Sequence, residues 1–120
     1  MILLVDDERS VRQFARTVLE RTGYEVRDAA SAEEALRMVR SEPSPQLLLT
    51  DIVMPGQNGI WLAAQFHRLH PATPVLFISG YSQNYQDELS GSVCLRKPFT
   101  PAELVAAVSD IISASRSARG

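Results

Sequence analysis

The feature that most constrains this chain is a set of short apolar runs, each followed by a charged or hydroxyl-bearing residue. Residues 1–5, 47–49 and 75–78 form continuous runs of this kind. A strand that is covered on both faces has no reason to alternate polar and apolar residues, so these runs predict buried strands. Asp51 stands at the end of the second run, and Pro55, Gly56, Asn58 and Gly59 then build a turn. The sequence therefore predicts that Asp51 lies where a buried strand leaves a sheet.

Between these runs, apolar residues recur at the spacing of helices. We predict four helices from this spacing. They begin after residue 8, at the Ser31-x-x-Glu34 capping box, at Ile60, and at a second capping box that starts at Thr100. A strand over residues 24–29 alternates apolar and charged residues, which places it near an edge of the sheet. We expect a brief last strand over 93–95 and a short or irregular helix over 81–91, where Leu89 is the only aliphatic residue.

Strands alternate with helices five times, and this order predicts an α/β fold with a doubly wound, parallel, five-stranded sheet. A length of 120 residues is that of a single domain that can bury a core without disulfides or metals. We place this domain over residues 1–112. Residues 113–120 are small and polar, and we interpret them as a polar tail or linker stub.

Composition excludes several classes of protein. The formal net charge is −2, whereas a nucleic-acid-binding domain would be clearly basic. The single cysteine, Cys94, rules out an internal disulfide, and we expect it to be a small buried residue of the last strand. No apolar run is long enough to span a membrane, and the N-terminus lacks the basic start of a signal peptide. We therefore expect a cytoplasmic protein.

Polar residues that follow the predicted strands mark the candidate site. In doubly wound sheets, ligands bind outside the carboxyl ends of the strands. That rule selects Asp6 with Asp7, then Asp51, Ser79 and Lys97, which follow four different strands. Half of the aspartates and the only lysine of the chain fall in this group. Taken alone, Asp51 is explained equally well as a cap of the following turn. The prediction of a functional site therefore rests on the whole group of residues at the strand ends and not on Asp51 by itself.

These residues suit the chemistry of a phosphoryl group. Three carboxylates at one edge repel one another and require a cation, and oxygen ligands suit Mg2+. An ammonium group and a hydroxyl group, here those of Lys97 and Ser79, can bind the oxygens of an anion. Carboxylates form aspartyl-phosphate intermediates, so Asp51 is the candidate nucleophile. The metal and the lysine would neutralise charge on the transferred group.

The candidate site residues stand in four motifs, Leu4-Val5-Asp6-Asp7-Glu8, Asp51-Ile52-Val53-Met54-Pro55-Gly56 with Asn58-Gly59, Ile78-Ser79-Gly80-Tyr81, and Lys97-Pro98-Phe99. With these motifs the chain resembles, over residues 1–112, the receiver domain of two-component signalling proteins. The resemblance implies a flavodoxin-like (βα)5 fold in which Asp51 accepts a phosphoryl group from the phosphohistidine of a histidine kinase. It also implies that Lys97-Pro98 is a cis peptide bond.

The resemblance further implies the roles of the site residues. Asp6, Asp7 and Asp51 would bind Mg2+ together with the backbone carbonyl of Val53, and Ser79 and Lys97 would contact the phosphoryl oxygens. The implied partner is a histidine kinase or a histidine phosphotransfer domain, with a homodimer as a further option and without direct contact to nucleic acid or membrane. The domain would not be a free-standing enzyme, and we expect its output to lie in another chain or in a parent protein such as a hybrid histidine kinase.

Cys94 departs from the pattern of the family, which usually has Tyr or Phe three residues before the lysine. That aromatic residue takes part in the signalling switch of the family, so an interaction module that works without phosphorylation is the alternative function. Enzymes of similar fold fit less well. A flavin-binding protein would need a phosphate loop after the first strand, where the acidic residues stand. A haloacid-dehalogenase-type phosphatase would need a second Asp in place of Val53.

Overall fold

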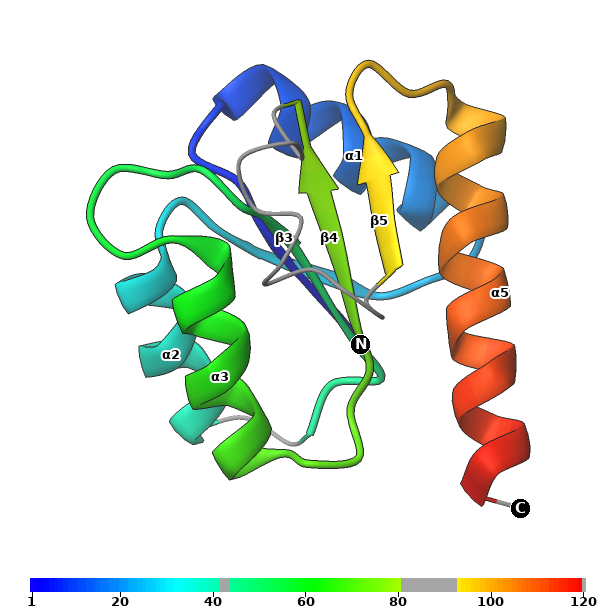
Figure 1. Cartoon of the computed structure of the whole chain (residues 1–120). Coiled ribbons are helices and arrows are strands. Elements are labelled where there is room, and N and C mark those ends of the chain that lie inside the picture. The colour runs from blue at the N-terminus through cyan, green and yellow to red at the C-terminus, as the bar shows by residue number, and fades with distance from the viewer. Residues whose placement is uncertain (42–43, 81–92, 120) are drawn as a thin grey trace.

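The computed structural model describes residues 1–41, 44–80 and 93–119, and they form a parallel sheet with helices on both faces (Figure 1). The strands are β1 (Ile2–Val5), β2 (Val26–Ala29), β3 (Leu47–Asp51), β4 (Val75–Ser79) and β5 (Val93–Arg96). The helices of these ranges are α1 (Arg9–Arg21), α2 (Ala32–Ser41), α3 (Gly59–Leu69) and α5 (Pro101–Arg119). The predicted helix over 81–91, like Tyr81 of the third motif, lies outside the described residues.

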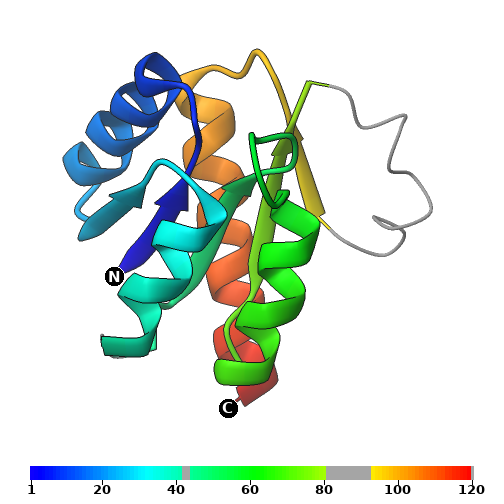
Figure 2. The same cartoon turned by 90° about the vertical axis from the view of Figure 1, so that its left-hand side faces the viewer.

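The strand order is β2-β1-β3-β4-β5, and all four pairings are parallel. Helices α1 and α5 cover one face of the sheet, and α2 and α3 cover the other (Figures 1 and 2). Every residue of β1 and β3 is buried, as expected for continuous apolar runs between two helical layers. The predicted five-stranded, doubly wound parallel sheet is confirmed, and so is the place of β2 at an edge.

Alternate residues of the strands supply the two halves of the core. One half joins Leu4, Leu49 and Ile78 to Leu19 of α1 and Leu104 of α5. In the other half, the strand residues Leu3, Val5 and Leu48 pack with residues of α2 and α3, namely Leu36, Leu62 and Phe66. Because side chains of a strand alternate between faces, each buried strand contributes to both halves. The packed sheet thus holds in place the residues that follow its strands.

The helix starts follow the capping signals of the sequence. The hydroxyl of Thr100 accepts a hydrogen bond from Glu103 N (3.1 Å), and the Glu103 carboxylate accepts one from Thr100 N (2.9 Å). Helix α5 then continues to Arg119, through the segment for which a polar tail is expected. Ile112 is a buried residue of this helix, and the Ser and Ala residues that follow it in the sequence are compatible with helical geometry. The division of the chain at residue 112 stays a prediction.

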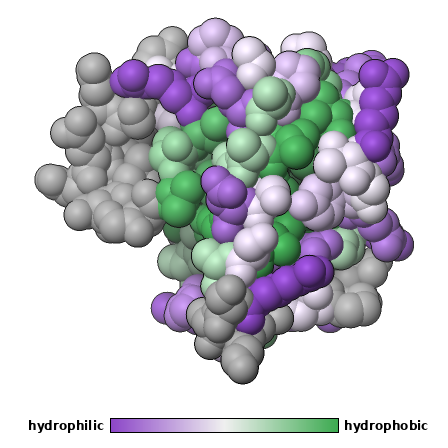
Figure 3. Space-filling view, turned by 90° about the vertical axis from the view of Figure 1, so that its right-hand side faces the viewer, coloured by the Kyte–Doolittle hydropathy of each residue, from purple (hydrophilic) through white to green (hydrophobic). Residues whose placement is uncertain are grey.

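The prediction of a buried Cys94 is wrong, because this residue is exposed. It lies on β5, the edge strand opposite β2, where Val93 is also 49% exposed. Among the described residues, Leu95 is the one member of this strand that packs against the core, on the face that α5 covers. Figure 3 shows hydrophobic residues gathered over the side of the molecule that carries α5. An edge strand lacks one neighbour, so its short apolar run is not a reliable sign of burial.

Two further features belong to the fold. The Lys97-Pro98 peptide bond is cis, as the resemblance implies. None of the helices in the described ranges combines the length and the hydrophobicity that a bilayer crossing demands.

Candidate functional site

The register of the sheet brings the predicted site residues to one edge. Val5 pairs with Thr50, so Asp6 and Asp51 leave neighbouring strands at the same level. Asp51 pairs with Ile78, which places Ser79 one residue further along β4. The amide of Lys97 donates a hydrogen bond to the Ser79 carbonyl (2.9 Å). Because parallel strands end at the same side, residues more than 90 positions apart in the chain become neighbours.

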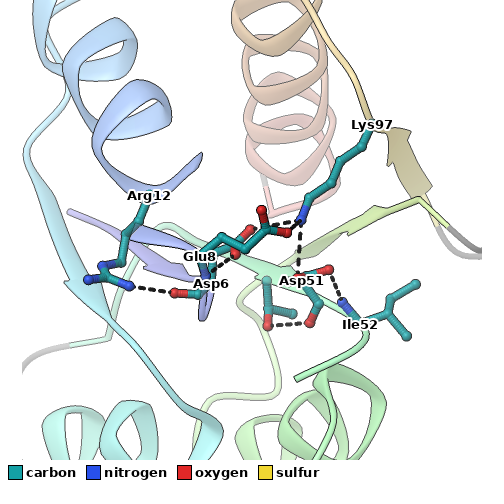
Figure 4. Close-up of polar contacts among 7 residues, drawn as sticks. Asp6, Glu8, Arg12, Asp51, Ile52 and Lys97 are labelled. Atoms are coloured by element: carbon teal, nitrogen blue, oxygen red, sulfur yellow. Dashed lines mark hydrogen bonds and ion pairs between the residues drawn. The ribbon is translucent and has the colours of Figure 1, made fainter. Parts of the chain in front are cut away.

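Asp51 is a buried carboxylate with two different partners. Its side chain is 7% exposed. The Oδ1 atom accepts a hydrogen bond from the amide of Ile52 (2.9 Å), and Oδ2 lies 3.2 Å from Nζ of Lys97 (Figure 4). One oxygen is therefore held by the backbone, while the other faces the lysine and can react.

Asp6 is fully buried and holds the loop that follows β1. Its Oδ1 atom accepts a hydrogen bond from the amide of Glu8 (2.9 Å), and its backbone carbonyl accepts one from Nη1 of Arg12 (2.8 Å). Nζ of Lys97 lies 3.3 Å from Oδ2. That contact lacks the geometry of a hydrogen bond, and within the described ranges no other donor reaches this buried oxygen. Asp6 thus turns one oxygen without a hydrogen bond toward the centre of the site.

Lys97 is the common partner of three carboxylates. Its Nζ atom lies 3.2 Å from Asp51 and 3.3 Å from both Asp6 and Glu8 (Figure 4). The lysine side chain is 19% exposed and that of Glu8 is 59% exposed, so Glu8 forms the outer side of this group. One ammonium group cannot neutralise three carboxylates, and the surplus charge is negative.

The surplus negative charge and the burial shift the pKa values. Burial, followed by the charge of Asp6, raises the pKa of Asp51 from 3.8 to about 6, although Lys97 opposes the shift. Burial is also the main reason why the pKa of Asp6 is raised. Burial by itself would lower the pKa of Lys97, but the charges of Asp51 and Asp6 outweigh it, and this pKa is raised. The lysine therefore stays cationic, and Asp51 is an unusually basic carboxylate.

The donor set fits a hard divalent cation. One oxygen each of Asp6, Glu8 and Asp51 lies within 4.8 Å of the others, and the buried Oδ2 of Asp6 still lacks a hydrogen bond. Carboxylate oxygens at this spacing are the ligands that Mg2+ prefers. Asp7 is exposed and is not part of this group of oxygens. The roles of Asp7 and of the Val53 carbonyl stay predictions, and Val53 itself is 47% exposed.

Ser79 and Lys97 both lie where the sequence places them. Ser79 ends β4 and is 1% exposed, next to the strand that carries Asp51. Sequence reasoning missed Glu8 and Arg12. Glu8 is the third acid of its motif, and that position was the only available signal. The contact of Arg12 with a backbone carbonyl leaves no signature in the sequence.

A pocket of about 420 Å3 adjoins the site. Its lining is mainly apolar and comes from the start of α1 and the loop before α5, namely Ser10, Val11, Phe14, Lys97, Pro98 and Phe99. The rings of Phe14 and Phe99 lie 5.9 Å apart, and Phe14 is 40% exposed. Lys97 therefore connects the acidic site with an apolar depression on the surface.

Comparisons with known proteins agree with this geometry. The sequence model of a family described as "Response regulator receiver domain" matches residues 2–109. The chain is 33% identical over 118 residues to the response regulator receiver protein CpdR of Brucella abortus, covering 95% of this chain and 98% of CpdR. It is also 33% identical over 118 residues to the alkaline phosphatase synthesis transcriptional regulatory protein PhoP of Bacillus subtilis, covering 95% of this chain and 49% of PhoP.

A solved structure supports the same relationship. The receiver domain of the hybrid histidine kinase CckA superposes with a TM-score of 0.80 at 36% identity, covering 92% of this chain and 97% of that domain. The chain thus spans almost all of some relatives, but only about half the length of curated relatives such as PhoP and YvrH.

Proposed function

Because the chain belongs to the response regulator receiver domain family, we propose that its Asp51 accepts a phosphoryl group from a phosphohistidine of a partner protein. It is a receiver domain of two-component signalling systems. The observation that carries the assignment to Asp51 is the contact of 3.2 Å between its Oδ2 atom and Nζ of Lys97, inside a group of buried acids. A raised pKa makes this carboxylate a better nucleophile than an ordinary aspartate.

The transfer needs a nucleophile and positive charge, and the chain supplies both. An oxygen of Asp51 attacks the phosphorus, and the new O–P bond forms as the P–N bond to the partner's imidazole breaks. The departing nitrogen keeps the electron pair and takes up a proton from water. Lys97 already lies 3.2 Å from the attacking carboxylate and would bind an oxygen of the incoming group. Ser79 at the end of β4 would donate its hydroxyl hydrogen to another.

Mg2+ is the cofactor that we assign to this site. Asp6 and Asp51 would hold it, with Asp7 and the Val53 carbonyl as the further ligands that the family resemblance implies. When bound, Mg2+ would neutralise charge on the phosphoryl oxygens. The buried Oδ2 of Asp6 supports this assignment, because it has an ion-pair contact with Lys97 but no hydrogen bond, and a bound cation would satisfy it.

The partner of this site is a histidine kinase or a histidine phosphotransfer domain. The apolar pocket between α1 and the loop before α5 is a place where such a partner could seat an apolar side chain close to Lys97. We assign the domain no free-standing enzymatic activity and a cytoplasmic location. A homodimer and a place within a hybrid histidine kinase are compatible with the same role.

Mass spectrometry of the intact protein tests the proposal. Treatment with acetyl phosphate and Mg2+ should add one phosphoryl group to the wild-type chain and none to Asp51→Asn. Asp110→Asn, a change of the same kind on the exposed surface of α5, is the matched control and should be labelled like the wild type. A folded wild-type chain that remains unlabelled would instead favour the phosphorylation-independent module, which the exposed Cys94 in place of an aromatic residue supports.

The raised pKa of Asp51 predicts that Mg2+ binding depends on pH. A proton and the cation compete for the same carboxylate, and the pKa of about 6 lies above the ordinary 3.8. The apparent dissociation constant of Mg2+ should therefore rise roughly tenfold between about pH 7 and about pH 5. Isothermal titration calorimetry at several pH values measures this change. An affinity that stays constant down to about pH 5 would contradict the participation of Asp51 in the cation site.

A further inference from the structure

We propose that Glu8 adjusts the site in two opposite directions: it strengthens the binding of the divalent cation, and it slows the reaction with an anionic phosphoryl donor. Glu8 is not among the residues to which the preceding sections assign a part in the transfer. The second half of the proposal rests on the function of Asp51 proposed above, whereas the first half does not.

The side chain of Glu8 is not used as a helix cap. Glu8 occupies the N-cap position of α1 in an extended conformation, where an acidic side chain can accept hydrogen bonds from the first turn. Within the described residues its carboxylate makes no such bond. It lies instead 3.3 Å from Nζ of Lys97, 89 positions away in the sequence. Glu8 therefore contacts Lys97 instead of capping α1.

The carboxylate of Glu8 belongs to the same group of oxygens as the two buried aspartates. Its oxygen lies within 4.8 Å of oxygens from Asp6 and Asp51. Asp6 is fully buried, and its Oδ2 atom, which has an ion-pair contact with Lys97 but no hydrogen bond, points into this group. A buried oxygen without a hydrogen bond is an independent sign of a ligand-binding site. A cation near Asp6 and Asp51 is therefore also near Glu8, and their attraction stabilises the bound state.

Glu8 acts against the phosphoryl donor for the same electrostatic reason. It is the most exposed of the three acids, at 59%, so an anion that approaches Asp51 from solvent meets its negative charge. It also competes for Lys97, which contacts Glu8 and Asp51 at nearly equal distances of 3.3 and 3.2 Å. Removal of this charge should leave Lys97 more available to the incoming group and reduce the repulsion of the donor.

The test compares Glu8→Gln with Glu25→Gln. Both changes remove one exposed carboxylate, but Glu25 precedes β2, and its carbonyl accepts a hydrogen bond from Ile2 N at the opposite end of the sheet. Calorimetric titration with Mg2+ should show a dissociation constant roughly three- to tenfold higher for Glu8→Gln than for the wild type. Glu25→Gln should bind Mg2+ like the wild type. This measurement needs no phosphorylation.

The second measurement is the rate of labelling by acetyl phosphate at saturating Mg2+. Glu8→Gln should react roughly two- to fivefold faster than the wild type at low salt, and the difference should shrink at high salt because ions screen an exposed charge. An unchanged Mg2+ affinity would overturn the first half of the proposal. Slower labelling, or a faster rate that salt does not reduce, would overturn the second half. If no variant is labelled, including the wild type, the function proposed for Asp51 fails and the cation result still decides the role of Glu8.

Discussion

Asp51→Asn should stabilise the folded protein by roughly 2–3 kcal/mol at neutral pH, while it removes the proposed acceptor of the phosphoryl group. The pKa of Asp51 is about 6 in the folded protein against an ordinary 3.8, so ionisation of this group opposes folding. The contribution of Asp51 to stability is fully present below about pH 4 and is lost as the pH rises through about 6. At neutral pH the neutral asparagine avoids this loss, because it carries no charge into the buried site.

Urea denaturation at several pH values measures this effect. The difference in the free energy of unfolding between Asp51→Asn and the wild type should be largest above about pH 6 and should shrink toward about pH 4. Asp110→Asn on the exposed surface of α5 should change stability by less than about 0.5 kcal/mol at any of these pH values. A variant that is less stable than the wild type at neutral pH would show that the contact with Lys97 outweighs the cost of burying the charge.

Gly59→Ala should destabilise the protein by roughly 3 kcal/mol. Gly59 begins α3, and its amide donates a hydrogen bond to the carbonyl of Ile52 (2.8 Å). A methyl group at this position would overlap the backbone carbonyl oxygen of Asp51 and would lie 3.1 Å from the Cα atom of Ile52. Both obstacles are backbone atoms at the end of a buried strand, so neither can rotate away.

Thermal and urea denaturation of Gly59→Ala, compared with Gly80→Ala, test this prediction. Among the described residues, a methyl group at Gly80 would meet no atom within 4 Å, so this control should unfold almost like the wild type. Wild-type stability of Gly59→Ala would mean that the turn after Asp51 can move away from the strand. The same variant should also be labelled less efficiently by acetyl phosphate, because the displaced backbone belongs to Asp51 itself.

The fold could be predicted because its signals are local. Continuous apolar runs at 2–5 and 47–49 mark strands buried on both faces, and the structure has β1 and β3 there. Capping residues mark the starts of α2 and α5, since the hydroxyls of Ser31 and Thr100 accept hydrogen bonds from amides three residues later. The general rule for the ends of parallel strands then brings Asp6, Asp51, Ser79 and Lys97 together.

Other features depended on contacts between distant segments. Cys94 is part of an apolar run like those of the buried strands, yet it is exposed because its strand is the last of the sheet. Strand order, and with it the number of neighbours of each strand, comes from pairing across the chain and not from the run itself. Helix α5 also runs to Arg119, into the segment that composition alone predicts to be a polar tail, because Ser and Ala residues are compatible with helical geometry.

The sequence by itself determined the alternation of strands and helices, the parallel sheet and the residues that meet at its edge. The spacing of apolar residues and the capping of helices are set by residues that lie close together in the chain. Only the tertiary structure decided that Glu8 and not Asp7 lies beside Lys97, and that Asp6 keeps one oxygen without a hydrogen bond. It also decided that burial raises the pKa of Asp51 to about 6. Side-chain direction and desolvation depend on atoms that come from four separate strands and their loops, and no local pattern in the chain records them.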